Sequence, residues 1–188
     1  MRVISGTARG CSLVSPVGEK TRPTGDRMKE DLFNILAHKV KGAVFLDVYC
    51  GSGAMGIEAI SRGASAAIFV DESPNAIKAT KANLQKTRLH EKARILHMPA
   101  AQALLQLKQS IKHDIIFLDP PYESTELTSS LTFIDQNDLL VKGGIIVAET
   151  MLNFKPPELD LINIYRTKKY KQMQFIFYEF GDILESGK

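Results

Sequence analysis

The tetrad Asp119-Pro120-Pro121-Tyr122 directly follows an apolar run, Asp114–Leu118, that is typical of a buried strand. The exocyclic amino group of a nucleic-acid base is a poor nucleophile, because its lone pair is conjugated into the ring. Two acceptors aimed at its N–H bonds, the Asp119 carboxylate and the Pro120 carbonyl, would favour the tetrahedral nitrogen that attack on a methyl group requires. The prolines would hold these acceptors rigid, and Tyr122 would stack on the base. The tetrad therefore predicts methylation of a planar amino group.

A second pattern, Asp47-Val48-Tyr49-Cys50-Gly51-Ser52-Gly53, joins a predicted strand to a predicted helix. Glycines let the backbone bend and approach a ligand, and a helix start offers N–H groups that lack partners. The glycines of residues 51–56 also satisfy the G-x-G-x-x-G pattern of nicotinamide dinucleotide sites. Asp47, four residues before the first glycine, favours a cofactor with a cationic methionine part, because a carboxylate would repel a pyrophosphate. We therefore expect S-adenosylmethionine at a site that includes Asp47, Gly51, Ser52 and Gly53.

Asp71 is a further acid at a predicted strand end, following the apolar run Ala66–Val70. A carboxylate at this place can accept hydrogen bonds from both ribose hydroxyls of a nucleoside. Nicotinamide and adenosylmethionine sites share this device, so Asp71 predicts a nucleoside cofactor without naming it.

Strand-like and helix-like runs alternate from Ala43 onward, which predicts an α/β doubly wound domain with a mostly parallel sheet. The predicted strands are Val44–Tyr49, Ala66–Val70, Ala93–His97, Asp114–Leu118, Gly144–Glu149, Leu161–Arg166 and Met173–Phe180. The predicted helices between them are Ala54–Arg62, Ser73–Arg88, Ala100–Gln109 and Leu127–Leu140. No helix separates the last two strands, so they should be antiparallel at one edge.

Residues 1–42 precede this domain and form a separate predicted unit. Arg2–Ser5 and Cys11–Ser15 are typical of a β-hairpin, and apolar residues at helical spacing predict a helix over Met28–Ala37. Residues 1–41 hold eight Lys and Arg against four Asp and Glu, whereas the rest carries sixteen against seventeen. Such a basic segment suggests a partner with phosphates. We therefore assign residues 1–42 to an RNA-contact extension and residues 43–188 to the catalytic domain.

The overall composition excludes several classes of protein. At 188 residues the chain fits one main domain, and it has no apolar run of the ~18–20 residues that span a membrane. Its start lacks the pattern of a signal peptide. Cys11 and Cys50 have neither metal-ligand spacing nor a disulfide framework around them. These features predict a cytoplasmic protein that binds no metal and does not associate with a membrane.

Stretches across nearly the whole chain resemble the RsmD family, bacterial methyltransferases that act on guanine N2 of 16S ribosomal RNA. The most distinctive is Thr21-Arg22-Pro23-Thr24, which is followed by Asp26-Arg27 and by Leu32-Phe33-Asn34-Ile35-Leu36. The glycine loop and the tetrad are shared with many amino-methyltransferases. The resemblance implies a class I (Rossmann-like) S-adenosylmethionine-dependent methyltransferase fold. It also implies a monomer whose partner is 16S rRNA within the small ribosomal subunit or an assembly intermediate.

Site residues carried over from the family match positions in this sequence. Asp119, Pro120 and Tyr122 would form the base site, and the cofactor site would contain Asp47, Gly51, Gly53 and Asp71. The family usually has Asp or Asn after the third strand, where Met98-Pro99-Ala100 stands. We therefore expect the backbone N–H of Ala100 to bind the adenine. The arginines expected to contact RNA phosphates are Arg2, Arg9, Arg22 and Arg27.

Three other functions fit parts of the sequence. One is a methyltransferase for N6 of adenine in DNA or for a glutamine amide in a protein. Glutamine enzymes usually have Asn where Asp119 stands, and DNA enzymes commonly carry a large target-recognition domain. A nicotinamide-dependent oxidoreductase would leave the tetrad at residues 119–122 unexplained. A catalytically silent binding module is disfavoured by the intact acceptor residues.

Overall fold

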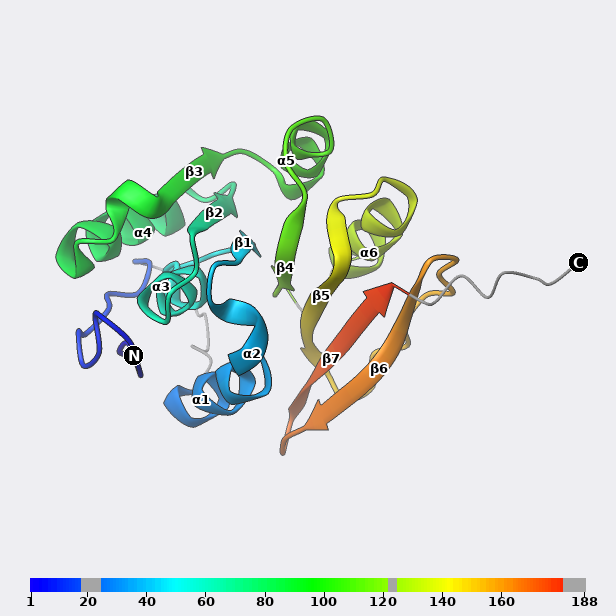
Figure 1. Ribbon diagram of the computed structural model, residues 1–188, viewed down its shortest axis with the longest axis horizontal. Coiled ribbons are helices and arrows are strands. Elements are labelled where there is room, and N and C mark those ends of the chain that lie inside the picture. The colour runs from blue at the N-terminus through cyan, green and yellow to red at the C-terminus, as the bar shows by residue number, and fades with distance from the viewer. Residues whose placement is uncertain (18–24, 122–124, 181–188) are drawn as a thin grey trace, which may run out of the picture.

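A single twisted sheet forms the centre of the molecule (Figure 1). The computed structural model describes residues 1–17, 25–121 and 125–180, and within these ranges seven strands pair in the order β3-β2-β1-β4-β5-β7-β6. The strands are β1 (Val44–Val48), β2 (Ala66–Asp71), β3 (Ala93–His97), β4 (His113–Leu118), β5 (Leu140–Met151), β6 (Ile162–Lys169) and β7 (Met173–Phe180). Strands β1 to β5 are parallel, and β7 runs antiparallel to both of its neighbours. This confirms the predicted α/β class and the antiparallel C-terminal edge.

Helices cover both faces of the sheet, which explains why the parallel strands are continuous apolar runs. The helices on one face are α1 (Asp26–Ile35), α2 (Ala37–Val40), α3 (Ala54–Ser61) and α4 (Pro74–Thr87). The helices on the other are α5 (Ala100–Leu107) and α6 (Glu126–Gln136). Phe45 and Phe117 pack in the apolar layer on the first face, which we call the α3 face. Leu46 and Leu118 pack on the second, because successive strand residues point to opposite sides.

Helix α4 shows how local chemistry sets the length of an element. The Ser73 side chain caps the helix by accepting a hydrogen bond from Ala76 N at 3.4 Å, and Pro74 occupies the first helical position. The helix ends at Arg88, which has a positive φ of 59°. A short 3₁₀ helix, His90–Lys92, then leads into β3.

The predicted N-terminal hairpin is only partly formed. One antiparallel bridge joins Arg2 to Ser12, and Val3 N donates to the Cys11 carbonyl at 2.9 Å. The predicted strand Arg2–Ser5 does not continue, because the N–H groups of Ile4 and Ser5 donate to the Glu58 carboxylate of α3 at 2.7 and 3.0 Å. The N-terminal loop is therefore attached to a helix of the main domain.

Two other predicted boundaries were wrong. The helix predicted over Met28–Ala37 is divided at Leu36 into α1 and α2. The helix predicted to reach Leu140 ends at Gln136, and Leu140 already belongs to β5. The intervening Asp138 has a positive φ of 49°, which a continuing α-helix does not allow. Within the described ranges, no helix has the length and apolar character needed to cross a membrane.

Candidate functional site

Acidic side chains gather at the edge of the sheet where the parallel strands end. Asp47 lies in β1, Asp71 ends β2, Asp119 follows β4 and Glu149 lies near the end of β5. The carboxyl ends of parallel strands meet at one edge, which is where open α/β sheets bind ligands. The fold thus brings together the three acids that the sequence predicted, and it adds a fourth.

The glycine loop between β1 and α3 needs glycine for two different reasons. Gly51 and Gly53 have positive φ values of 54° and 74°, which favour glycine. At Gly56 the limit is space, because a Cβ atom would lie 2.4 Å from the ring of Phe69. The loop therefore turns sharply and lets α3 pack directly on β2.

Two polar side chains of α4 brace this loop from below. Thr80 Oγ1 donates to the Gly51 carbonyl at 2.9 Å, and Asn83 Nδ2 donates to the Ser52 carbonyl at 2.8 Å. The Ser52 side chain is 8% exposed, and its hydroxyl lies 3.9 Å from the sulfur of Met1. These contacts preorganise the backbone of the predicted cofactor loop.

Asp47 is only 1% exposed, and its carboxylate accepts a hydrogen bond from Gly56 N at 2.9 Å. Burial, only partly offset by this hydrogen bond, raises the pKa of Asp47 to about 8. The side chain therefore fixes the first turn of α3. A direct contact between Asp47 and a cofactor remains a prediction.

Asp71 links the glycine loop to the start of α4. One carboxylate oxygen accepts from Gly51 N at 2.8 Å, and the other accepts from Ser73 N at 2.9 Å. The Asp71 carbonyl also accepts from Met98 N, which connects β2 to the segment after β3. Ala100 is the first residue of α5, so its N–H is among those that have no acceptor within the helix.

Asp119 and Pro120 stand between β1 and β5, directly beyond β4. Asp119 is partly exposed and Pro120 is buried. Burial raises the pKa of Asp119 well above its usual range, and the nearby carboxylates of Glu149 and Asp47 raise it further. Tyr122, the third predicted catalytic residue, lies outside the described residues.

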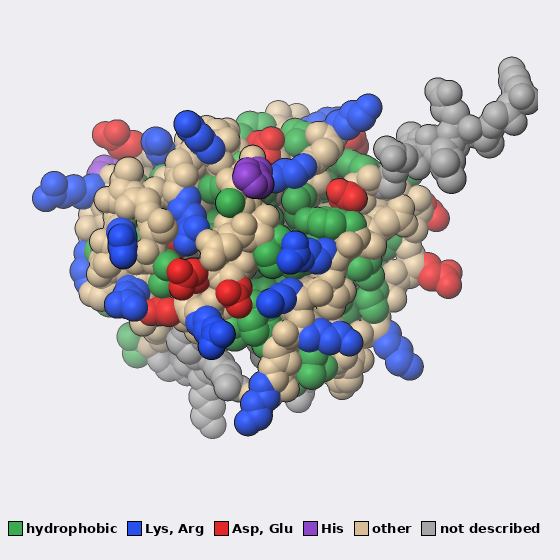
Figure 2. All heavy atoms as spheres, turned by 60° about the horizontal axis from the view of Figure 1, so that its bottom comes forward, with side chains coloured by type: hydrophobic (Ala, Val, Ile, Leu, Met, Phe, Trp, Pro, Cys, Tyr) green, Lys and Arg blue, Asp and Glu red, His purple; other side chains and the backbone are tan. Residues whose placement is uncertain are grey.

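Figure 2 shows Lys and Arg side chains spread widely over the face that it turns toward the viewer. Arg2 is 66% exposed in its side chain and pairs with Asp26 at 3.1 Å. Arg9 and Arg27 are exposed, and Arg22 lies outside the described residues. Their contact with RNA remains a prediction.

Sequence reasoning missed Glu149, Thr80 and Asn83. Glu149 carries the same signal as Asp47 and Asp119, an acid that ends a buried apolar strand, and that signal could have identified it. Thr80 and Asn83 give no such signal, because a polar residue within a helix is usually exposed. Within the described residues, no group of three or more His, Cys, Asp or Glu side chains could hold a metal ion.

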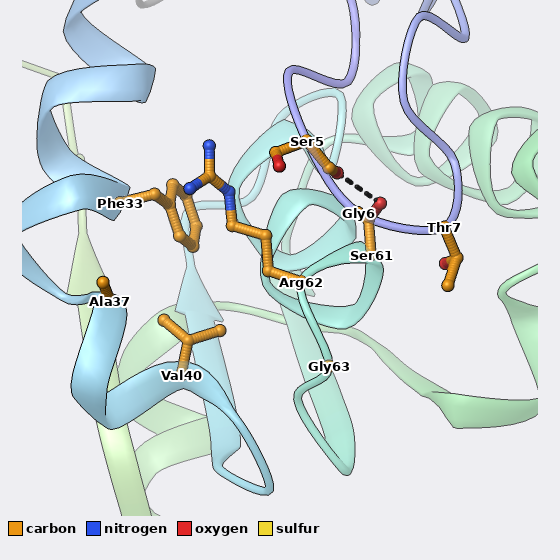
Figure 3. Close-up of a pocket in the computed structure, with 9 residues that line it drawn as sticks. All are labelled: Ser5, Gly6, Thr7, Phe33, Ala37, Val40, Ser61, Arg62 and Gly63. Carbon is orange, nitrogen blue, oxygen red and sulfur yellow. Dashed lines mark hydrogen bonds between the residues drawn. The ribbon is translucent and has the colours of Figure 1, made fainter.

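A cavity of about 620 Å³ lies beside the C-terminal end of α3 (Figure 3), and none of the strand-end acids lines it. Its lining is formed by Ser5, Gly6, Thr7, Phe33, Ala37, Val40, Ser61, Arg62 and Gly63. Gly6 must be glycine, because a Cβ atom there would lie 1.8 Å from the Ser61 carbonyl oxygen. The cavity marks the seam between the N-terminal loop and the main domain.

Comparisons with known proteins find relatives that match most of the chain. A profile described as "Conserved hypothetical protein 95" matches residues 1–179. The chain is 42% identical to "Putative rRNA methyltransferase YlbH" of Bacillus subtilis, over 84% of this chain and 86% of that protein. It is 31% identical to "Ribosomal RNA small subunit methyltransferase D" of Escherichia coli K12, over 95% and 89% of the two chains.

Solved structures show the same relationship. The solved structure described as "Putative methyltransferase yhhF from Escherichia coli" superposes with a TM-score of 0.83 at 30% identity, covering 96% of this chain and 97% of that one. The fold also matches SMU.776, described as complexed with SAH, with a TM-score of 0.65 at 14% identity and coverage of 80% and 49%. The fold is that of Rossmann-like S-adenosylmethionine-dependent methyltransferases.

Proposed function

The chain belongs to the RsmD family, and on this premise we propose that it transfers a methyl group from S-adenosylmethionine to the exocyclic N2 of a guanine in 16S rRNA. The relatives named for rRNA methylation support the broader activity, an rRNA methyltransferase. The guanine target is the finer part of the proposal, and it follows from the family resemblance.

The observation that carries the proposal is the position of Asp119 and Pro120. They follow β4, which lies between β1, the strand that leads into the glycine loop, and β5. A carboxylate and a backbone carbonyl at this point can accept both N–H groups of a planar amine. Their preorganisation favours the nitrogen geometry needed for attack on a methyl group. We propose that Tyr122 stacks on the base and keeps it in line.

The residues at the strand ends fit the proposed cofactor. Gly51 borders open space, since a Cβ atom placed there would meet no atom within 4 Å, so a ligand can approach the loop backbone closely at this residue. Asp71 stands at the end of β2, where a carboxylate can accept from ribose hydroxyls. The uncompensated acids Asp47 and Asp119 favour a cationic ligand over a pyrophosphate. When bound, S-adenosylmethionine supplies the sulfonium methyl group for the transfer.

The excess of Lys and Arg in the N-terminal segment supports our proposal that residues 1–42 contact RNA. The proposed phosphate ligands are Arg2, Arg9, Arg22 and Arg27. We propose that the substrate is the RNA within the small ribosomal subunit or an assembly intermediate, because aromatic residues make up only 7% of the sequence and would add little base stacking beyond Tyr122. The protein itself would then supply the chemistry and part of the affinity.

The test is a substrate panel. The full chain is incubated with methyl-labelled S-adenosylmethionine and, separately, with undermodified 30S particles, naked 16S rRNA, 23S rRNA and duplex DNA. We expect label on a guanine N2 in the particle. Label on adenine, on protein or on DNA would contradict guanine N2 as the target. Equal labelling of naked 16S rRNA would contradict the proposal that the particle is the substrate.

A further inference from the structure

Glu149 is a buried acid that the proposed chemistry has not used. It is 3% exposed, close to the C-terminal end of β5. Leu118 of β4 pairs with Ala148 of β5, so Asp119 and Glu149 are the next residues on two parallel strands roughly 4.8 Å apart. Both continue the alternation that places Val147 on the α3 face. The two carboxyl groups therefore occupy neighbouring positions at the base site.

The surroundings of this pair are acidic. Among the described residues, the charged groups that act on Asp119 are Glu149 and Asp47. Tyr170, in the turn between β6 and β7, donates its hydroxyl to Asp31 of α1 at 3.2 Å. Burial and the carboxylates of Asp31 and Glu149 raise the pKa of Tyr170 to about 12, so its hydroxyl stays neutral. Among the described residues, the titratable groups recorded as acting on the pair thus include Asp47 of β1 and Tyr170 of the turn, and Asp31 and Arg27 of α1 act in turn on Tyr170.

The proposed reaction requires a proton acceptor at this point. When the amino nitrogen uses its lone pair to bond the methyl group, the broken S–CH₃ bond leaves its electron pair on sulfur. The nitrogen then carries a positive charge, which is lost when one N–H proton moves to a carboxylate oxygen. Two neighbouring carboxyl groups that act on each other electrostatically cannot both ionise easily, so together they hold a proton better than one alone.

We propose that Glu149 is a positioning residue that acts through Asp119, forming with it the carboxyl pair that receives and holds the proton released by the methylated amino group. This inference rests on the proposed function. Asp119 contacts the amino group, and Glu149 makes Asp119 a stronger base and keeps its carboxylate turned toward the substrate. The proton passes to solvent when the product leaves.

The first experiment measures methyl transfer by the full-length Glu149→Gln variant against wild type, across a range of pH. We expect the maximal rate to fall at least about tenfold, with the KM for RNA and the affinity for S-adenosylmethionine changed less than about twofold. The acidic limb of the rate profile should move to lower pH, because removing the neighbouring charge lowers the pKa of Asp119. Glu179→Gln on β7, opposite Ile145, is the matched control and should behave as wild type.

The second experiment needs no substrate. Carboxyl-labelled wild-type protein and Glu149→Gln are titrated by ¹³C NMR, with Asp119→Asn used to assign the Asp119 signal. Wild type should show two separated, coupled steps for Asp119 and Glu149, and the variant one step at lower pH. If Glu149→Gln fails to fold, Glu149→Asp and the wild-type titration decide the same question.

The outcomes separate the two proposals. Coupled titration without any methyl transfer to RNA would contradict the proposed function and leave the pair intact. Methyl transfer to RNA with an unchanged rate and pH limb in folded Glu149→Gln would overturn the role of Glu149. Independent titration of the two groups would overturn it as well.

Discussion

Buried Glu58 and the strand-end acids Asp47 and Asp119 lie on the same face of the sheet and differ in how their charge is balanced. Glu58 in α3 is 0% exposed, and it accepts hydrogen bonds from Ile4 N, Ser5 N and Arg62 Nε. The buried ammonium group of Lys29 lies 3.6 Å away. Burial is the largest influence on Lys29 and lowers its pKa, while the charge of Glu58 opposes this.

Asp47 and Asp119 lack such balance. Asp47 has one backbone donor, and the groups that act most strongly on Asp119 after burial are two further acids. Glu58 fixes the N-terminal loop through its hydrogen bonds. It also contributes to stability, because without it the buried ammonium group of Lys29 would have no carboxylate partner. An uncompensated set costs stability, but it stays available to a cation and to an amino group. The balance of charge, and not the burial, separates Glu58 from the proposed functional acids Asp47 and Asp119.

The largest expected effect is a loss of stability when Glu58, the acid with charged partners, is removed. Glu58→Ala should lower the free energy of unfolding by about 3–5 kcal/mol, because it leaves the Lys29 charge buried without its partner. Denaturant unfolding followed by circular dichroism measures this loss. Glu91→Ala, at an exposed position, is the control and should change stability by less than about 0.5 kcal/mol. A loss below about 1 kcal/mol for Glu58→Ala would contradict the proposed difference between Glu58 and the strand-end acids Asp47 and Asp119.

Asp119→Asn should reduce activity without reducing stability. The rate of methyl transfer should fall about 10²–10³-fold, because the amide is a weaker acceptor and cannot take the proton. Binding of S-adenosylmethionine, measured by equilibrium dialysis, should stay within about threefold of wild type. The midpoint of thermal unfolding should be equal or higher, since an uncompensated acid has been removed. Unchanged transfer would exclude Asp119 from the reaction.

Asp47→Asn tests the cost of an uncompensated acid through pH. In the unfolded chain Asp47 ionises near its usual value of 3.8, and in the folded protein near 8. The folded state therefore binds more protons between these values, so wild-type stability should decrease as pH rises from about 4 to about 8. Asparagine can still accept from Gly56 N but does not titrate.

The decline in unfolding free energy over this pH range should be smaller in Asp47→Asn by at least about 1 kcal/mol. Chemical denaturation at several pH values gives both slopes. If the unfolding free energies of the two proteins changed equally with pH, Asp47 would not cause the predicted loss of stability. Asp119→Asn, measured in the same way, reports the contribution of the neighbouring acid.

The smallest effect concerns the basic surface. Arg27→Ala should weaken RNA binding about threefold and reduce the dependence of log affinity on log salt by about 1, because one phosphate contact is lost. Filter binding at several salt concentrations measures the slope. Arg94→Ala is the matched control, since Arg94 is exposed on β3 at the opposite edge of the sheet. An equal change in both variants would indicate a general charge effect.

The sequence predicted what local pattern determines. The limits of β3 and β7 were correct, since their apolar runs are bounded by residues that end strands, and the glycine loop was located by spacing alone. The N-terminal hairpin was overestimated, because only the tertiary structure shows that Glu58 takes the N–H groups of Ile4 and Ser5. The tetrad predicted Asp119, whereas its pairing with Glu149 depends on the register of β4 and β5. Contacts between distant segments were the part that pattern could not supply.

The order of the sheet has a consequence for synthesis of the chain. β7 lies between β5 and β6, although it is translated after both. β6 therefore leaves the ribosome before its pairing partner exists, and the growing chain carries an open β5 edge until β7 emerges. Phe175 and Tyr178 of β7 complete opposite apolar layers of the core. Both layers thus close in one late step, and a nascent chain paused at the β6–β7 turn would expose them together.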